Sequence, residues 1–278
     1  MRLRRIDSEL VRRKLARSRT HAQEMIAEGR VKLDGEVVMK PARQMDPAQA
    51  IVIAESEQIE YVSRGAHKLA GALDSLGEAA PIVRGRRCLD AGASTGGFTD
   101  VLLRRGAASV VAVDVGYGQL AWRLQSDPRV EVRDRTNVRT MKAGDVDPAP
   151  SLVVGDMSFI SLTLVIPALV AVAAENADFL LMVKPQFEIG KERLGHGGVV
   201  RNPEHHVETV ESVARCAMDN GLGILAIEAS PLPGPSGNVE YFLHMRAGDS
   251  DAIASEELHS RIEDAVRRRP AGGGEDTR

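Results

Sequence analysis

The sequence predicts a doubly wound α/β domain preceded by a small α+β domain, on three observations. From residue 87 onward, short apolar runs alternate with helical patterns, as in a parallel sheet covered by helices on both faces. The first of these runs leads through a glycine-rich turn into a helix, over residues 87–99. The first 45 residues show two short helical patterns and a hairpin signal instead, and they are strongly basic.

Length and composition limit what the chain can be. At 278 residues it can hold one large domain of about 200 residues and a small appendage. Aromatic residues make up only 3%, so base stacking should not dominate any nucleic-acid site. The two cysteines, Cys88 and Cys216, indicate a reducing compartment, and we expect both to be packing residues.

Neither the N-terminus nor any apolar run predicts a membrane segment. Residues 162–174, the most apolar run, are too short to span a bilayer and contain Pro167. We interpret them as a core-facing helix, and the N-terminus as free of a signal peptide. The sequence therefore predicts a cytoplasmic protein without membrane contact.

Charge is distributed unevenly along the chain. Residues 1–45 carry twelve Lys or Arg against six Asp or Glu, a charge of +6, which leaves −9 for the rest of the total of −3. A polyanion partner bound at the N-terminus would explain this bias, and a solvated charged face would explain it about equally well.

The N-terminal elements follow from capping and turn signals. Residues 8–15 have a helical pattern, and a second helix begins after Ser18 as N-cap and ends before Gly29. Asp34-Gly35, between residues 31–33 and 37–39, predicts a hairpin on a type I′ turn.

This order, with Arg-Ile-Asp-Ser-Glu-Leu-Val-Arg-Arg-Lys-Leu-Ala-Arg-Ser-Arg and Lys40-Pro41, resembles the S4 RNA-binding domain over about residues 5–53. The resemblance implies a basic two-helix face that binds structured RNA through phosphates and shape. Its candidate RNA contacts are Arg4, Arg5, Arg12, Arg17, Arg19 and Lys40, with Arg64 added from the next domain.

Composition shifts set the expected domain boundaries. We expect the S4 domain over residues 1–53, a polar linker over 54–62, the α/β domain over 63–250, and a C-terminal helix with a disordered tail over 251–278. The α/β domain should open with a helix running to residue 76, which carries Lys68.

The glycine turn is a candidate cofactor site. Ser94 occupies the position where a dinucleotide-binding turn needs its second glycine, which disfavours a nicotinamide cofactor. The pattern Asp-x-Gly-x-x-x-Gly, followed by Asp114 at the end of the next strand, resembles S-adenosylmethionine-dependent methyltransferases, although a structural turn in another α/β protein stays possible. The resemblance implies S-adenosylmethionine as cofactor, with Asp114 accepting hydrogen bonds from its ribose hydroxyls. The candidate contacts are Asp90, Gly92, Ser94, Thr95, Gly96, Gly97, Phe98, Asp114 and Val115.

The remaining patterns complete a sheet. They predict helices over residues 98–105, 119–125 and 203–218, and strands over 110–114, 130–132, 151–155, 179–183, 222–229 and 239–245. The methyltransferase resemblance implies that the last strand is reversed.

Four polar residues form the candidate catalytic group: Lys68, Asp156, Lys184 and Glu240. Their order resembles the Lys-Asp-Lys-Glu tetrad of FtsJ-like ribose 2′-O-methyltransferases. Together with the S4 domain and segments such as Val183-Lys-Pro-Gln-Phe-Glu, the chain resembles TlyA-type (hemolysin A family) ribosomal RNA methyltransferases over about residues 5–246. That family implies methylation of cytidine 2′-hydroxyls in 23S and possibly 16S ribosomal RNA.

The chemistry explains why such residues are needed. A ribose hydroxyl is poorly ionised at neutral pH, so its attack requires deprotonation or stabilisation of negative charge. Lys184 is the candidate for either task, with Lys68 and burial disfavouring its charged form and Asp156 and Glu240 opposing that shift. The histidines show no metal-ligand spacing, so we expect no metal.

Two other functions remain open from the sequence. The family's hemolysin name suggests a membrane-active protein, and the S4 resemblance alone would fit a non-catalytic ribosome-assembly factor. The partners we expect are ribosomal RNA and ribosomal subunits, with a monomeric protein favoured.

Overall fold

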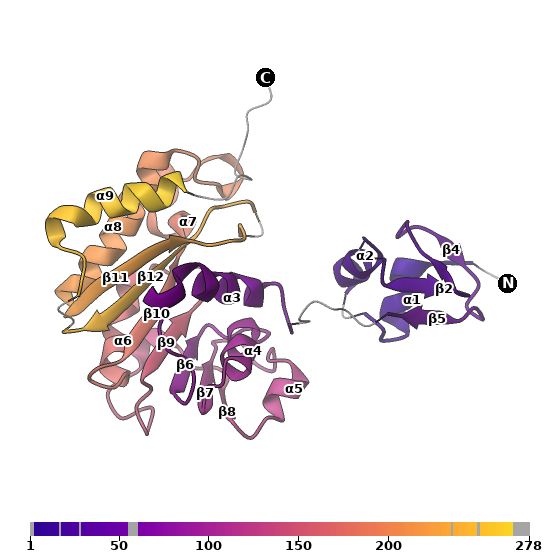
Figure 1. The fold of residues 1–278 in the computed structure, drawn as a ribbon, viewed down its shortest axis with the longest axis horizontal. Coiled ribbons are helices and arrows are strands. Elements are labelled where there is room, and N and C mark those ends of the chain that lie inside the picture. Colours follow the sequence, from indigo (N-terminus) through magenta and orange to yellow (C-terminus); the bar gives the residue numbers. More distant parts are fainter. Residues whose placement is uncertain are drawn as a thin grey trace. The chain divides into compact units, whose positions relative to one another are not determined.

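The computed structural model describes residues 3–16, 18–27, 29–54, 61–234, 236–248 and 251–268, without the side chains of Glu24 and His196. The chain forms two compact units, Met1–Glu60 and Tyr61–Arg278 (Figure 1). Arg17 and the tail beyond residue 268 lie outside the described residues.

The N-terminal unit packs two helices on short strands. Helices α1 (Ile6–Arg12) and α2 (Arg19–Ala27) accompany a three-stranded antiparallel sheet and a two-stranded one. The strands are β1 (Arg4–Arg5), β2 (Val31–Leu33), β3 (Glu36–Val37), β4 (Gln44–Met45) and β5 (Ile51–Ile53). Their apolar side chains form one core that includes Ile6, Leu10, Ile26, Val31 and Leu33.

The hairpin turn and the second N-cap of this unit were predicted correctly, and three of its short strands were not predicted. Asp34 and Gly35 both have positive φ, as a type I′ turn requires, and the Ser18 hydroxyl accepts the His21 N–H at 3.1 Å as an N-cap. Helix α1 begins two residues and ends three residues earlier than predicted, before Lys14, which has a φ of +60°. Strands β1, β4 and β5 are too short to give a sequence pattern.

The second unit is built on a seven-stranded sheet in the order β11-β12-β10-β9-β6-β7-β8. The strands are β6 (Arg87–Ala91), β7 (Ser109–Val113), β8 (Val130–Arg133), β9 (Leu152–Gly155), β10 (Asp178–Val183), β11 (Leu222–Ala229) and β12 (Tyr241–Ala247). Strands β10, β9, β6, β7 and β8 are parallel, whereas β12 is antiparallel to both of its neighbours. The predicted doubly wound sheet and its reversed last strand are therefore confirmed.

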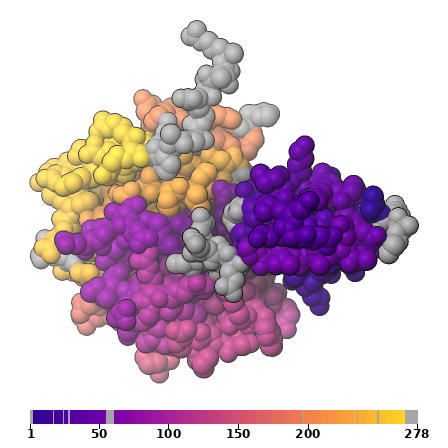
Figure 2. All heavy atoms as spheres, turned by 45° about the vertical axis from the view of Figure 1, so that its right-hand side comes forward, coloured from indigo at the N-terminus to yellow at the C-terminus, as the bar shows by residue number. Residues whose placement is uncertain are grey.

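Helices cover both faces of this sheet because its strands are apolar on both sides. Leu89 and Val111 pack with α6 (Ile166–Val172), α8 (Pro203–Asp219) and α9 (Ser255–Arg267). Cys88 and Val110 face the opposite way, toward α3 (Gly65–Leu76), α4 (Gly97–Arg104) and α5 (Trp122–Gln125). Figures 1 and 2 both show the yellow α9 beside the orange α8.

Three predicted elements differ from the structure. The apolar stretch 162–174 is a 3-10 turn (Leu162–Leu164) followed by α6, because Pro167 suits only the start of a helix. Helix α5 is one turn long, and β12 begins two residues later than predicted, which leaves Glu240 just before the strand. Both cysteines are free, and burial raises the pKa of the Cys88 thiol to about 12, as expected of a packing residue.

Candidate active site

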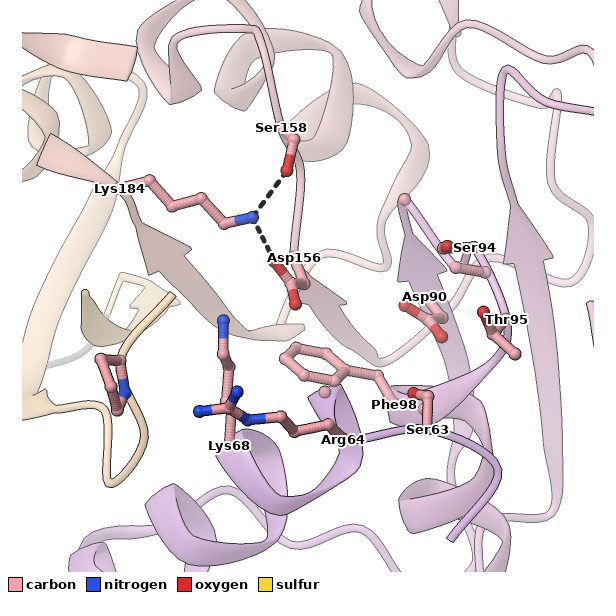
Figure 3. A pocket seen from close by; sticks show the side chains of 15 residues that line it. Ser63, Arg64, Lys68, Asp90, Ser94, Thr95, Phe98, Asp156, Ser158 and Lys184 are labelled. Atoms are coloured by element: carbon pink, nitrogen blue, oxygen red, sulfur yellow. Dashed lines mark hydrogen bonds and ion pairs between the residues drawn. The ribbon is translucent and has the colours of Figure 1, made fainter. Parts of the chain in front are cut away.

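A pocket of about 350 Å³ opens at the carboxyl edge of the parallel strands, where such sheets bind ligands (Figure 3). The residues that line it come mainly from the turn after β6, the start of α3 and the loops after β9 and β10. The lining residues are Ser63, Arg64, Gly65, Lys68, Asp90, Gly92, Ala93, Ser94, Thr95, Gly97, Phe98, Asp156, Ser158, Lys184 and Pro233.

The turn after β6 depends on glycine at two positions. Gly96 has a φ of +97°, and a Cβ there would lie 2.3 Å from a methyl carbon of Leu124. A Cβ at Gly97 would lie 2.4 Å from the Ser63 hydroxyl oxygen and 2.8 Å from the backbone nitrogen of Ala66. A larger side chain at Gly96 would therefore push against α5, and one at Gly97 would separate α4 from the start of α3.

Asp90 is fully buried beneath this turn. Its Oδ2 accepts the Thr99 N–H at 2.9 Å and the Thr99 hydroxyl at 2.7 Å, whereas its buried Oδ1 has no hydrogen-bond partner among the described residues. Burial raises the pKa of Asp90 to about 7, with nearby Asp156 and Asp114 acting in the same direction. An unpartnered buried acceptor of this kind suits a ligand that brings a positively charged donor.

Asp114 follows β7 at the same edge. Its two oxygens accept the Ser94 N–H at 2.8 Å and the Gly116 N–H at 2.7 Å. Each carboxylate oxygen can accept a further hydrogen bond, so the pair can bind two vicinal hydroxyls. Asp114, Val115 and Gly96 do not line the pocket itself, and Val115 is exposed.

These residues fit S-adenosylmethionine. The turn lines the pocket, Asp90 has an acceptor for an ammonium group, and Asp114 has acceptors for ribose hydroxyls. An α-amino acid joined to a nucleoside carries these donor groups, whereas the glycine spacing disfavours a pyrophosphate.

The four candidate catalytic residues form two ion pairs, and all of them except Glu240 line this pocket. Lys184, directly after β10, lies 2.5 Å from Asp156, which follows β9. Lys68, in the first turn of α3, donates to Glu240 at 2.5 Å. The Lys68 and Lys184 side chains are only 7% and 8% exposed, so each charge depends on its partner.

Sequence reasoning missed three residues that support these pairs. Ser158 accepts a hydrogen bond from Lys184 Nζ at 2.8 Å, as Figure 3 shows, and Gln186 donates to Glu240 at 3.2 Å. Glu188 accepts the Ser161 hydroxyl at 2.5 Å and the Leu162 N–H at 2.8 Å, which ties the segment after β10 to the loop after β9. Burial raises the pKa of Glu188. Gln186 and Glu188 were visible only as neighbours of Lys184 in Lys-Pro-Gln-Phe-Glu.

The candidate RNA contacts fall into two groups. Arg4, Arg5, Arg12 and Arg19 surround two carboxylates of α1, and Lys40 is exposed in the loop after β3. Arg64 belongs to the second unit and lines its pocket.

Neither a metal centre nor a membrane span emerges from the described residues. No group of three or more His, Cys, Asp or Glu side chains there could hold a metal ion. Within the same ranges, every helix is too short or too polar to cross a bilayer.

The fold and the pocket define a methyltransferase that uses S-adenosylmethionine. The chain belongs to the FtsJ-like methyltransferase family, whose model matches residues 61–247, and an S4 domain matches residues 4–51. It thereby falls in the TlyA-type group, in which both domains occur in one chain.

Relatives of known name cover almost the whole chain. The "16S/23S rRNA (cytidine-2'-O)-methyltransferase TlyA" of Mycobacterium tuberculosis is 52% identical over 96% of this chain and 98% of its own. The "Putative rRNA methyltransferase YqxC" of Bacillus subtilis is 36% identical over 94% and 93%. The solved structure of a "Putative hemolysin" from Streptococcus thermophilus has a TM-score of 0.71 at 35% identity, covering 96% and 97%.

Proposed function

We propose that this protein transfers a methyl group from S-adenosylmethionine to the 2′-hydroxyl of a cytidine in ribosomal RNA. The observation that carries the proposal is the Lys184–Asp156–Ser158 cluster on the wall of the cofactor pocket. The nucleotide and the RNA class come from the M. tuberculosis relative, which is named for that reaction on 16S and 23S ribosomal RNA. We expect the enzyme to act in the cytoplasm, where ribosomal RNA is its proposed substrate, and as a monomer.

Asp90, Asp114 and the turn between them would hold the cofactor. Its chemical contribution, when bound, is a methyl group activated by attachment to a sulfonium. Asp90 would bind the ammonium group through its unpartnered oxygen, and Asp114 would bind the ribose hydroxyls. Phe98 and the glycine positions shape the wall between these two carboxylates.

Lys184 would act on the 2′-hydroxyl. An ammonium group has three N–H bonds. Ser158 accepts one of them and Asp156 lies 2.5 Å away as the ion-pair partner, so at least one N–H can point to the ribose oxygen. That hydrogen bond strengthens as negative charge develops on the oxygen, so it lowers the barrier without requiring tight binding of the ground state. This geometry favours a positively charged clamp over a neutral base, and the proton that the 2′-hydroxyl loses would pass to the Asp156 carboxylate in the same pocket or to water.

The Lys68–Glu240 ion pair would have a structural role in the pocket. Glu240 neutralises the buried Lys68 and accepts from Gln186, so both carboxylate oxygens are used within the protein. A Cβ at Gly234 would lie 2.7 Å from Glu240, so the chain approaches this carboxylate closely. We infer that this pair fixes the shape of the pocket and its charge balance, with Arg64 near the entrance to meet the RNA backbone.

The decisive experiment is transfer of isotopically labelled methyl to ribosomal RNA, with the product mapped to a single nucleotide. We expect one 2′-O-methylated cytidine per modified RNA, and transfer by the Lys184→Ala variant that is slower by about 10²- to 10⁴-fold. Binding of RNA without transfer would instead support an assembly factor, and leakage of liposomes by the purified protein would support a membrane-active one. Separate reactions on the two ribosomal subunits would identify the substrate.

A further inference from the structure

Two carboxylates of helix α1 are buried beneath exposed arginines. Asp7 and Glu9 are 0% and 1% exposed, although α1 is only seven residues long and polar. The arginines around them are half exposed, with 43% to 57% of each side chain in solvent. We call Arg4, Arg5, Arg12 and Arg19 the arginine fan.

Asp7 organises one half of the fan. Arg5 donates to both of its oxygens, from Nε at 3.1 Å and from NH2 at 2.9 Å. Arg19, twelve residues away on α2, donates from NH2 at 3.0 Å. The same carboxylate accepts the Ser8 N–H at 2.8 Å, so its position is fixed by the backbone of α1.

Glu9 organises the other half. Arg12 donates to it twice, from Nε at 2.8 Å and from NH2 at 2.6 Å, and Arg4 lies 3.6 Å away. Arg13 donates from Nε at 2.9 Å and ties the cluster to the backbone oxygens of Pro47 and Gln49. The neighbouring Arg12 guanidinium lowers the pKa of Glu9 to about 2, so the carboxylate stays charged at physiological pH.

This geometry leaves the outer side of the guanidinium groups available. Arg5 and Arg12 use Nε and NH2 for their carboxylates, and their NH1 nitrogens have no acceptor in the described part of the chain. Five arginines surround two carboxylates, so the cluster keeps a net positive charge. A hollow of about 340 Å³ is lined by Leu3, Arg4, Arg5, Ser8 and Glu9, and it has room for a phosphodiester group beside the two arginines, whose charges outnumber that of Glu9.

We propose that Asp7 and Glu9 are positioning residues that hold the arginine fan in one geometry, ready to bind the phosphates of structured RNA. Free arginine side chains lose rotamer entropy when they bind a phosphate, and a fan already held by carboxylates loses less. The planar guanidinium can bind a carboxylate on one edge and a phosphate on another. The inference rests on the proposed function, because ribosomal RNA is the expected polyanion.

The test separates an effect of charge from an effect of positioning, because the two predict opposite changes in RNA affinity. Glu9→Gln makes the RNA-binding face more positive, so charge alone predicts tighter binding, whereas positioning predicts weaker binding. The matched control is Glu36→Gln, which removes the same charge from a 77% exposed residue paired with Arg43 at 3.1 Å. In full-length protein titrated with ribosomal RNA, we expect Glu9→Gln to weaken binding three- to tenfold and Glu36→Gln to change it less than twofold.

A double-mutant cycle separates positioning from loss of structure. If Glu9 acts through Arg12, Glu9→Gln should cost clearly less in an Arg12→Ala background, whereas general destabilisation should cost the same in both. Binding by Glu9→Gln as tight as wild type, or equal losses in both backgrounds, would overturn the inference.

A second pair of variants serves if thermal unfolding shows that Glu9→Gln disrupts the N-terminal unit. Arg12→Lys keeps the charge of a half-exposed residue and removes its double contact with Glu9, and Arg43→Lys is its control. We expect a three- to tenfold loss only in Arg12→Lys, and equal binding by both variants would contradict positioning. Methylation of ribosomal RNA by wild type is measured alongside, because its absence would refute the proposed function rather than this inference.

Discussion

The two units of the chain each hold a cluster of opposite charges, but the buried partner differs. In the N-terminal unit the carboxylates Asp7 and Glu9 are buried and the arginines around them reach solvent. In the pocket of the second unit the lysines themselves are buried, each against one carboxylate. The first arrangement presents cations to a large partner, and the second keeps them from water.

This difference determines how each cluster should respond to its surroundings. Exposed charges are screened by salt over about 8–10 Å, so the arginine fan should make RNA binding depend on ionic strength. Buried ion pairs are screened much less, and removal of one partner leaves an unpaired charge. We therefore expect substitutions in the first unit to change binding and substitutions in the second to change the rate of reaction.

The largest effect is expected for Lys184→Ala. Loss of the group that we propose to stabilise the 2′-oxygen should lower the single-turnover rate by about 10²- to 10⁴-fold, while cofactor and RNA affinities change little. Lys191→Ala, which changes an exposed lysine outside the pocket, is the control. If Lys184→Arg retains part of the rate, Lys184 is a charged clamp, and if it retains none, a neutral base is favoured, because guanidinium stays protonated.

The cofactor site should be sensitive to Asp114. Asp114→Ala leaves the ribose hydroxyls without acceptors and should weaken S-adenosylmethionine binding by roughly 1–3 kcal/mol, or about 5- to 150-fold. Asp134→Ala removes a similar contact, an acceptor for the Gly118 N–H at 2.9 Å, and should leave affinity unchanged. Calorimetry with and without RNA measures both, and an unchanged affinity in folded Asp114→Ala would refute this placement of the ribose.

Asp90 should make cofactor binding depend on pH. Its pKa is about 7 in the folded protein, whereas the ordinary value is 3.8. At a pH between these two values, Asp90 is protonated in the folded state and ionised in the unfolded state. The contribution of Asp90 to the free energy of unfolding therefore falls as pH rises from about 4 to 7, and the carboxylate needed for an ammonium group forms near pH 7. We expect cofactor affinity to rise roughly eightfold between pH 6 and 7.5, in step with the ionised fraction of Asp90.

The control for this prediction is Asp90→Asn, which cannot titrate. Its cofactor affinity should be weaker and nearly flat over the same pH range. An equally steep pH dependence in Asp90→Asn would assign the titration to another group.

The smallest effect is expected for a substitution in the arginine fan. Arg19→Ala should weaken ribosomal RNA binding a few-fold and reduce the slope of log affinity against log salt by about 0.7 to 0.9, because one phosphate contact is lost. Replacing Arg17 as well tests a predicted contact that lies outside the described residues. The control is Arg43→Ala, and an identical slope in Arg19→Ala and wild type would exclude Arg19 from the interface.

The sequence predicted the sheet because its signals are local. Each strand and its following turn are adjacent in the chain, so the glycine turn at Gly96 and the strand ends at Asp114, Asp156 and Lys184 could be placed from pattern alone. The pairing within the tetrad could not, since Lys68 and Glu240 are 172 residues apart. The resemblance named these residues, but only packing reveals which carboxylate holds which lysine.

Other features escaped prediction for related reasons. Asp7 and Glu9 lie in a highly charged stretch that indicates an exposed helix face, and their burial depends on arginines from β1 and α2 that fold over them. Ser158 follows Asp156 by two residues in a loop without a repeating pattern, so nothing local indicated its contact with Lys184. Whether a charged side chain is buried depends on which residues pack around it in the folded protein, and the periodicity of the sequence does not show that.

One measurement tests the central division between the two clusters: single-turnover methylation of ribosomal RNA at saturating S-adenosylmethionine, as a function of RNA concentration. It is made with wild type, Lys184→Ala and Arg19→Ala. The account predicts that Arg19→Ala needs more RNA but reaches the wild-type maximal rate, whereas Lys184→Ala needs the same RNA concentration and reaches a far lower rate. A lowered maximal rate in Arg19→Ala, or a near-native one in Lys184→Ala, would contradict it.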